Sequence, residues 1–391
     1  MTPVAAITDL KPSYIREILN LANHGDIISL AGGLPCSETF PTQILEEVMP
    51  AIAADKQLLQ YAPTAGYAPL ISHLHARFQV PETHGVMVTT GSQQGIDLCA
   101  RVFLGHGDKV VTESPSYLGA LQVFAIAQAT ILSVTQESDG PNLQQLEDHF
   151  KAGDVKCFYT VPDFHNPTGC CWSLEKRQAV AALCIRYQVL LIEDAPYRDI
   201  RFSGTSLPLV SSFCPEVAIC LRSFSKILAP GLRVAALIMP KRWLPLFDKV
   251  KQATDLHSAS LTQGVALAVL EHSAFEQHLA DTVARYSTHY EALANELDVL
   301  CRELGNGYQF DPVEGGMFIW LKLPDCDTYQ VAKAAIENGV TVVPSAEFYP
   351  SSSKPQAALR LNFSHNEPAV IREGISRLKQ TLVATLGCAA R

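Results

Sequence analysis

The sequence has no excess of basic residues. Lysine and arginine together number 30, against 39 aspartate and glutamate residues in 391, which gives a formal net charge of −9 and a pI of about 5.7. A domain that binds nucleic acid through its phosphates normally carries a basic face and a high pI. The composition therefore predicts no nucleic-acid partner.

Long uncharged runs are also scarce. The longest extends from Ser114 to Gln136 and is interrupted by Pro115, Gln122 and Gln128. A transmembrane helix needs about 20 predominantly apolar residues in succession, so we expect a helix followed by a buried strand here. The first ten residues, MTPVAAITDL, lack the positive region and apolar stretch of a signal peptide. These absences predict no membrane span and a cytoplasmic location.

Cysteine is present in 11 copies, but the spacings that would give it a metal or disulfide role are missing. No two cysteines have C-x-x-C spacing, and Cys170 and Cys171 are adjacent, which suits neither a zinc site nor an easy disulfide. We therefore expect reduced, mostly buried thiols in a cytoplasmic protein and no metal site.

Short apolar runs do occur, and they alternate with helical patterns through the middle of the chain. Hydrophobic residues make up 48% of the sequence and charged residues 18%, which is a globular composition. Strands that are apolar on both faces and separated by helices predict an α/β fold with a largely parallel sheet covered by helices on both sides. The expected strands are 86–90, 109–113, 130–134, 155–160, 189–192, 217–221 and 233–239. Helices are expected to open at Gly91-Ser92, after Pro115, at Pro141 and after Ser173 as the N-cap.

The last third of the chain has a different pattern, and its length allows two to three domains at about 150 residues each. A long amphipathic helix is expected over 273–304, followed by strands at 317–323, 340–343 and 358–362, a helix at 328–338 and a final helix. This mixture predicts a smaller α+β domain. We expect an N-terminal segment (1–40) that packs with the small domain, a large domain (41–272) and a small C-terminal domain (273–391).

Polar clusters follow several of the expected strands, where ligands bind in open α/β sheets. Gly91-Ser92-Gln93-Gln94 opens a helix whose free N–H groups and dipole would suit a phosphate, although an ordinary helix cap looks the same. Asn166-Pro167-Thr168-Gly169 follows another strand and could equally be a plain turn.

Two further clusters contain groups that would suit a cofactor. Asp194 ends a fully apolar strand, with Tyr197 close behind, so we expect a half-buried carboxylate paired with a cation. That cation could be a protonated pyridine nitrogen or the partner in a structural salt bridge. Lys226 follows two hydroxyl-bearing residues, Ser223 and Ser225, and a lysine in a dry pocket can form a Schiff base. Arg233, seven residues later, could hold a phosphate with its fork of donors.

At this point the sequence resembles a known family. Ser223-Phe224-Ser225-Lys226 followed by Pro230-Gly231-Leu232-Arg233 resembles the lysine motif of class I/II aminotransferases, which are pyridoxal-5′-phosphate (PLP) enzymes of fold type I. Further segments resemble the 2-aminoadipate, kynurenine and aromatic aminotransferase branch: 28–35 (ISLAGGLP), 59–61 (LQY), 91–94 (GSQQ), 162–169 (PDFHNPTG), 314–318 (EGGMF) and 359–364 (LRLNFS). The similarity extends from about Ile15 to Ser364 and implies that the large domain binds PLP.

The resemblance implies a role for each matching residue near the cofactor. Lys226 would hold PLP as a Schiff base and then move the proton at the substrate Cα, while Asp194 would pair with the pyridine nitrogen. Tyr197 and Asn166 would hydrogen-bond to the ring hydroxyl oxygen, and Tyr117 would stack on the ring. The phosphate would be held by Ser92, Gln93, Ser223, Ser225 and Arg233.

The resemblance also implies substrate and partner contacts. Arg360 would grip the substrate α-carboxylate, with Gly33 and Asn166 close to the substrate. Arg16 matches a mobile arginine that some members use for a second carboxylate. Tyr61 matches a tyrosine that reaches the phosphate of the partner subunit, which implies a homodimer with shared active sites.

Three departures from the family pattern add or remove side chains near these positions. Arg198 replaces the glycine that usually ends Glu-Asp-Asp-Pro-Tyr-Gly, and Ala195 replaces the second aspartate. Arg222 replaces the glycine before Ser-Phe-Ser-Lys, and Val234, Ala235 and Ala236 stand where a β-branched residue, a glycine and an aromatic residue are usual. Our hypothesis is that Arg198 and Arg222 reshape the substrate side or its entrance.

The leading hypothesis is an aminotransferase that moves an amino group between an L-amino acid and a 2-oxo acid such as 2-oxoglutarate. Glutamate, aminoadipate, aromatic and branched-chain amino acids all remain open as donors. The alternative is a lyase, racemase or condensing enzyme of fold type I, because these enzymes share the fold and the cofactor residues. Arg360 favours transamination over decarboxylation. A transcription regulator is disfavoured, because the match begins near Ile15 and leaves no room for a DNA-binding region.

Overall fold

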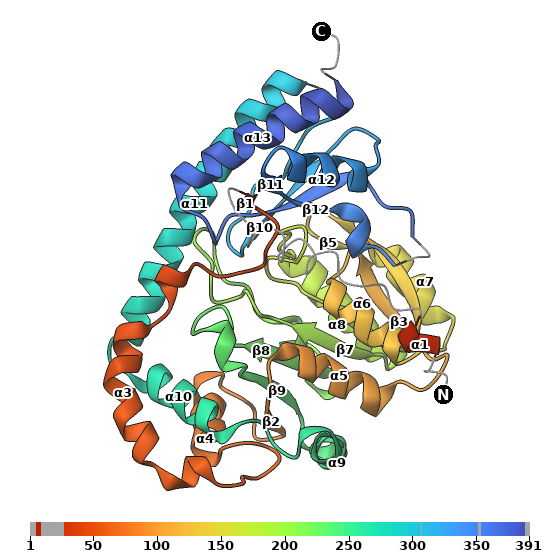
Figure 1. The fold of residues 1–391 in the computed structure, drawn as a ribbon. Helices are drawn as coiled ribbons and strands as arrows, with labels where there is room; N and C mark the ends of the chain where they lie inside the picture. The colour runs from red at the N-terminus through yellow and green to blue at the C-terminus, as the bar shows by residue number, and fades with distance from the viewer. Residues whose placement is uncertain (1–4, 9–26, 306, 351–352, 388–391) are drawn as a thin grey trace.

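The large domain is built on an eight-stranded sheet. The computed structural model describes residues 5–8, 27–305, 307–350 and 353–387 (Figure 1). The sheet has the order β2-β9-β8-β7-β6-β3-β4-β5. Its strands are β2 (His84–Thr89), β3 (Lys109–Ser114), β4 (Thr130–Glu137), β5 (Gly140–Pro141), β6 (Val155–Thr160), β7 (Leu190–Asp194), β8 (Ala218–Ser223) and β9 (Ala235–Pro240). The strands from β4 through β3, β6 and β7 to β8 pair in parallel, whereas β9 is antiparallel to both β8 and β2, and β5 is antiparallel to β4.

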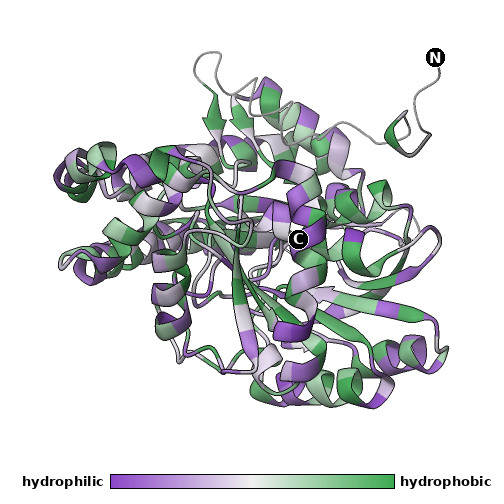
Figure 2. Ribbon diagram, turned by 90° about the horizontal axis from the view of Figure 1, so that it is seen from below, coloured by the Kyte–Doolittle hydropathy of each residue, from purple (hydrophilic) through white to green (hydrophobic). Residues whose placement is uncertain are grey.

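Helices cover both faces of this sheet, as the alternation of apolar runs and helical patterns predicts. Leu190 and Ile192 of β7 belong to one apolar core, and Leu191 between them belongs to another. The helices of this domain are α3 (Thr42–Ala54), α4 (Ala68–Arg77), α5 (Ser92–Phe103), α6 (Leu118–Ile126), α7 (Leu143–Lys151), α8 (Leu174–Tyr187), α9 (Leu244–Asp255) and α10 (Ser260–Glu271). Figure 2 shows the strands largely in the hydrophobic colour and the outer helices in mixed colours, as expected for two-sided burial.

A smaller α+β part packs above the sheet in Figure 1. It contains an antiparallel sheet of order β10-β13-β12, formed by β10 (Phe318–Lys322), β13 (Ala358–Asn362) and β12 (Val343–Pro344). Its helices are α11 (Phe275–Leu304), α12 (Thr328–Glu337) and α13 (Pro368–Leu386). Helix α11 runs along the edge of the molecule from the neighbourhood of α3 and α10 up to α13 and so links the two parts (Figure 1).

The described part of the N-terminal segment contacts the small part. Strand β1 (Ile28–Ser29) pairs in parallel with β11 (Val340–Thr341), and the backbone N–H of Leu30 donates to Thr341 O at 2.9 Å. The domain boundaries near residues 40 and 272 stay a prediction. The remaining short elements are α1 (Ala5–Thr8) and the 3-10 turns η1 (Ser37–Thr39), η2 (Lys56–Leu59), η3 (Val210–Ser212), η4 (Pro215–Val217), η5 (Pro230–Leu232), η6 (Lys241–Trp243) and η7 (Ser345–Phe348).

Two expectations from the sequence are wrong in this region. Pro141 does not open a helix: Gly140–Pro141 forms β5, and α7 starts after Asn142, whose side chain accepts from the Gln145 backbone N–H at 2.9 Å. Strand β4 lies next to the short edge strand β5 and is not fully buried, since Val134 is its one buried residue. No helix in the described ranges is both long and apolar enough to cross a membrane.

Candidate functional site

Ten of the residues singled out in the sequence line one cavity of about 150 Å³. They lie at the ends of strands and at the start of a helix, as the open-sheet rule predicts: Asp194 ends β7, Ser223 ends β8 and Ser92 begins α5. The ten are Ser92, Gln93, Tyr117, Asn166, Asp194, Tyr197, Ser223, Ser225, Lys226 and Arg233. Val161, Pro196 and Pro230 complete the lining.

Lys226 supplies a partly buried amine to this cavity. Its Nζ donates to the backbone carbonyl of Gly33 at 3.0 Å, so the N-terminal segment reaches the cavity at the residue that the sequence indicated. Burial, together with the positive charges of Arg233 and Arg360, lowers the pKa of Lys226 from 10.5 to about 8. Roughly a tenth to a fifth of the amine is therefore neutral near physiological pH, and the neutral form is the one that attacks an aldehyde.

One end of the cavity is suited to an anion. Ser92 is the first residue of the 12-residue helix α5, whose free N–H groups carry partial positive charge. Gly91 has φ +79°, and a Cβ placed there would lie 2.4 Å from Arg233 Nη2. Only glycine lets the guanidinium approach the helix start this closely. Ser223 and Ser225 are each 8% exposed and bring two more hydroxyls to the cavity.

Asp194 provides a buried negative charge to the same cavity. It is 2% exposed, so the expectation of a half-buried carboxylate is wrong. Its Oδ2 accepts from the Tyr159 hydroxyl at 3.0 Å, and its Oδ1 has no hydrogen-bond partner among the described residues. Burial raises the pKa of Asp194 from 3.8 to about 7. A buried carboxylate oxygen without a donor calls for a cation or an N–H group from a ligand.

Asn166 connects the cavity to a second buried cation. Its Nδ2 donates to the Tyr197 hydroxyl at 3.3 Å, and its Oδ1 accepts from Arg360 Nη1 at 2.9 Å. Arg360 is 2% exposed and also donates to Ala31 O at 2.6 Å, while its Nε has no partner in the described part of the chain. Burial lowers the pKa of Arg360 to about 10 and raises that of the Tyr197 phenol. An arginine held in this way can receive a carboxylate.

Three contributors to the site were not found from the sequence. Tyr159 lies on β6 and looks like any other residue of an apolar strand until pairing with β7 brings it to Asp194. The rings of Phe318 and Phe348 flank Arg360, with centroids 4.3 and 5.1 Å from its Cζ. These rings shield the guanidinium from water and fix its plane.

Two residues that the sequence indicated as site residues, Tyr61 and Arg16, are not placed at the cavity around Lys226 in this chain. Tyr61 is 79% exposed and packs edge-on against His257, with ring centroids 5.9 Å apart. Arg16 lies outside the described residues.

Arg198 and Arg222, the two arginines that depart from the family pattern, each form an ion pair with an aspartate. Arg198 Nη1 donates to Asp163 at 2.9 Å, and Arg222 Nη2 donates to both carboxylate oxygens of Asp199 at 3.0 and 2.9 Å. Neither arginine is among the residues that line the cavity around Lys226. That Arg198 and Arg222 reshape the substrate side or its entrance stays a prediction.

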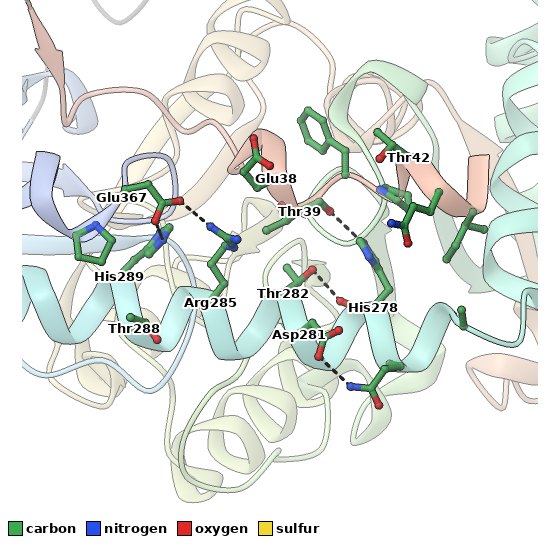
Figure 3. A pocket seen from close by; sticks show the side chains of 17 residues that line it. Glu38, Thr39, Thr42, His278, Asp281, Thr282, Arg285, Thr288, His289 and Glu367 are labelled. Atoms are coloured by element: carbon green, nitrogen blue, oxygen red, sulfur yellow. Dashed lines mark hydrogen bonds and ion pairs between the residues drawn. The ribbon is translucent and has the colours of Figure 1, made fainter. Parts of the chain in front are cut away.

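A larger cavity of about 830 Å³ lies between η1, the start of α3, α11 and the start of α13 (Figure 3). Its polar groups largely satisfy one another, since Arg285 donates to Glu367 at 2.6 Å and His278 Nε2 lies 3.0 Å from Thr39 O. None of the candidate site residues lines it.

Comparison with known proteins gives one consistent family. Residues 25–378 match the model of aminotransferase class I and II. The chain is 34% identical over 387 residues to aromatic-amino-acid aminotransferase 1 of Thermococcus litoralis, covering 95% of this chain and 92% of the relative. It is 34% identical over 385 residues to 2-aminoadipate transaminase of Thermus thermophilus, covering 96% and 95%. The crystal structure of Pyrococcus horikoshii kynurenine aminotransferase with PMP superposes with a TM-score of 0.92 at 34% identity, covering 98% and 97%.

The cavity has the groups that PLP requires. It offers donors for a phosphate and a lysine with a lowered pKa for the aldehyde. It also offers a protonated pyridine nitrogen a buried carboxylate oxygen that has no hydrogen-bond partner in the described part of the chain. The comparisons do not favour the lyase, racemase or condensing-enzyme alternative. The chain therefore belongs to the class I and II aminotransferases, in the aromatic, 2-aminoadipate and kynurenine branch, and is a PLP-dependent aminotransferase.

Proposed function

We propose that the cavity around Lys226 is the active site, and that it transfers the amino group of an L-amino acid to a 2-oxo acid such as 2-oxoglutarate. The observation that carries this proposal is that Asp194 Oδ1, a buried carboxylate oxygen with no hydrogen-bond partner among the described residues, lines the same cavity as the partly buried Lys226. PLP, when bound, supplies an electron-withdrawing ring that accepts the electron pair from the substrate Cα.

The residues of this chain would divide the remaining work. The start of α5, the hydroxyls of Ser92, Ser223 and Ser225, the Gln93 side chain and Arg233 would hold the phosphate. Asp194 would keep the pyridine nitrogen protonated, because a charged partner compensates a carboxylate that burial alone makes weakly acidic. Asn166 and Tyr197 would donate to the ring oxygen, and the Tyr117 ring would lie against the ring face.

Substrate orientation would come from Arg360. Its guanidinium is held by Asn166 and Ala31 O and flanked by two phenyl rings, so it would meet the α-carboxylate in a fixed plane. Once released by the substrate amine, Lys226 would be the base and acid at Cα, because its lowered pKa of about 8 suits both directions of proton transfer. Gly33 would lie beside the substrate and Arg16 would meet a second carboxylate.

The donor would come from the amino acids named in the relatives, namely aromatic amino acids, 2-aminoadipate and kynurenine, with glutamate and branched-chain amino acids as further candidates. The exposed Tyr61 supports a homodimer in which this tyrosine completes the phosphate site of the partner subunit. A cytoplasmic location fits the sequence pattern.

A half-reaction titration tests the proposal. The protein is loaded with PLP and freed of oxo acids, and single amino acids are added while the visible absorbance of the lysine-bound cofactor is followed. We expect one or more donors to bleach the band and 2-oxoglutarate to restore it. A Lys226→Ala variant, the matched control, should lack the band. A wild-type band that no donor in a broad panel converts would contradict transamination.

A further inference from the structure

A cluster of buried charges adjoins the active-site cavity. Asp163 Oδ1 accepts from Arg177 Nη2 at 2.6 Å, and Asp163 Oδ2 accepts from Arg198 Nη1 at 2.9 Å. Asp163 is 1% exposed, and Arg177 and Glu193 are both 0% exposed. Glu193 directly precedes Asp194, and Arg198 directly follows Tyr197. The cluster and the cavity therefore share the same stretch of chain.

The Asp163 carboxylate pairs with two arginines, Arg177 and Arg198. Burial alone would raise the pKa of Asp163, but Arg177 and Arg198 beside it hold that pKa below its ordinary value. Burial raises the pKa of Glu193, whose oxygens accept from the backbone N–H groups of Val210 and Ser211 at 2.9 and 2.8 Å.

The Arg198–Asp163 pair ties together two segments that both reach the cavity. Asp163 belongs to the loop after β6 that carries Asn166, and Arg198 belongs to the turn after β7 that carries Tyr197. Asn166 Nδ2 and the Tyr197 hydroxyl form a second link between the same two segments, at 3.3 Å. A hydrogen bond of that length is at the weak end of the range. Its geometry therefore depends on the stronger, charge-assisted pair beside it.

We propose that Arg198 is a positioning residue for the cofactor: through Asp163 it holds the Asn166 amide and the Tyr197 hydroxyl at the spacing at which both reach the ring oxygen of PLP. This inference rests on the proposed function, in which Asn166 and Tyr197 bind that oxygen. Arg198 Nη2 also donates to Leu207 O at 2.5 Å, which fixes the plane of its guanidinium. A lysine could make one of these two contacts but not both.

Arg222 provides a matched control on the neighbouring strand. Both arginines stand where the family has glycine, and both pair with a carboxylate. Arg222 is buried and pairs with Asp199, and its Cζ lies 4.3 Å from the Phe78 ring centroid, whereas Arg198 is partly buried. Among the described residues, its hydrogen bonds go to Asp199 and not to Asp163 or the Asn166 loop, although its charge also acts on Asp163. Arg201, the other arginine of this turn, bonds to Glu314 and lies over Phe164, with 4.7 Å between its Cζ and the ring centroid. Removing Arg222 therefore deletes a comparable positive charge but leaves the ion pair between Arg198 and Asp163 in place.

The test compares Arg198→Gln, Arg198→Lys and Arg222→Gln in the PLP-loaded enzyme. The readout is the pH midpoint at which the absorbance of the lysine-bound cofactor changes. Donors to the ring oxygen weaken it as an acceptor for the Schiff-base proton, so loosened donors should let that proton persist to higher pH. We expect Arg198→Gln to raise the midpoint by roughly 0.5 to 1 pH unit, the size of one lost hydrogen bond. Arg198→Lys should give less than half of that rise, and Arg222→Gln none.

Kinetics separate positioning from substrate selection. Arg198→Gln should lower kcat/KM roughly tenfold for every donor, because a misplaced cofactor oxygen affects all substrates alike, and the ranking of donors should stay the same. An unshifted midpoint in Arg198→Gln, an equal shift in Arg222→Gln, or a changed donor ranking would overturn the proposal.

Measuring the wild type alongside distinguishes this inference from the proposed function. A wild type without a titrating cofactor band overturns the proposed site. A titrating wild type with an unshifted Arg198→Gln overturns only the role of Arg198. If Arg198→Gln does not fold, Arg198→Lys decides, since it keeps the charge and still predicts a measurable upward shift.

Discussion

Replacing Asp194 by asparagine should stabilise the protein without cofactor and weaken its binding of PLP. The carboxylate is 2% exposed, Tyr159 donates to its Oδ2 at 3.0 Å, and Ser92 also stabilises its charged form. Burial raises its pKa from 3.8 to about 7. The difference between these two values corresponds to roughly 4 kcal/mol against the charged form in the folded state. Asparagine has nearly the same shape and can still accept from Tyr159, but it carries no charge to bury.

The pH dependence of this effect follows from the same two values. The unfolded chain releases the Asp194 proton near 3.8, whereas the folded chain holds it to about 7. The wild type without cofactor therefore loses stability as the pH rises above about 4, and the loss is complete above about 7. The advantage of Asp194→Asn in the free energy of unfolding should grow by roughly 2–3 kcal/mol between about pH 5 and about pH 8.

Bound PLP should reverse the preference for asparagine over Asp194. A protonated pyridine nitrogen facing Asp194 would form a buried charge pair, and removing one member of such a pair costs about 3–5 kcal/mol. PLP should therefore bind Asp194→Asn roughly 10²–10³-fold more weakly. Denaturant unfolding of the cofactor-free protein at both pH values and a PLP titration measure the two effects. A variant whose stability advantage does not grow with pH, or which binds PLP as tightly as wild type, would refute this reasoning.

Four further predictions follow from the same geometry. The rate at which PLP forms a Schiff base with the cofactor-free protein should rise with pH to a plateau with a midpoint near the Lys226 pKa of about 8, and a midpoint near 10.5 would contradict the burial argument. Arg360→Lys should raise the KM for amino acids roughly 10²-fold in steady-state assays, because an ammonium cannot replace the planar fork between Phe318 and Phe348; an unchanged KM would place the carboxylate elsewhere. Gly91→Ala should weaken PLP binding roughly tenfold or more, since its Cβ would push Arg233 away at a residue with φ +79°; unaltered affinity would remove Arg233 from the phosphate site. Tyr61→Phe should also weaken PLP binding roughly tenfold, although Tyr61 is exposed in its own chain. A mixed dimer of one Tyr61→Phe subunit and one Lys226→Ala subunit should contain one intact site. Wild-type affinity in Tyr61→Phe would argue against a shared site.

The strand ends could be predicted from the sequence because each buried strand is a short apolar run followed at once by polar residues. Asp194 after β7 and Ser223 at the end of β8 were located in this way, and parallel pairing brings such ends to one edge of the sheet. The elements themselves shift by only a few residues from their expected bounds. Pro141 is the clear failure, since a proline at a helix start and a proline in a two-residue edge strand share the same backbone preference.

The degree of burial of Asp194 and the ion-pair partners of Arg198 and Arg222 could not be predicted, because they depend on residues distant in the sequence. The burial of Asp194 results from β6, β7 and α5 meeting around it, so the half-buried expectation underestimated the packing. Arg198 and Arg222 looked like charges added beside a cofactor, but their carboxylates, Asp163 and Asp199, were not recognisable as partners from the sequence pattern. A local pattern shows which residues are polar, not in which direction a guanidinium points.

The central claim is that Lys226 is the residue that binds the cofactor. Borohydride reduction of the PLP-loaded protein, followed by mass spectrometry of its peptides, identifies the modified lysine directly. Lys251 provides an internal comparison, because its side chain is 0% exposed and burial lowers its pKa, yet it pairs with Asp255 at 2.8 Å. We predict the phosphopyridoxyl mass on the peptide that contains Lys226 and its absence from the peptide that contains Lys251. The label on Lys251 or on any other lysine, with Lys226 unmodified, would contradict the account.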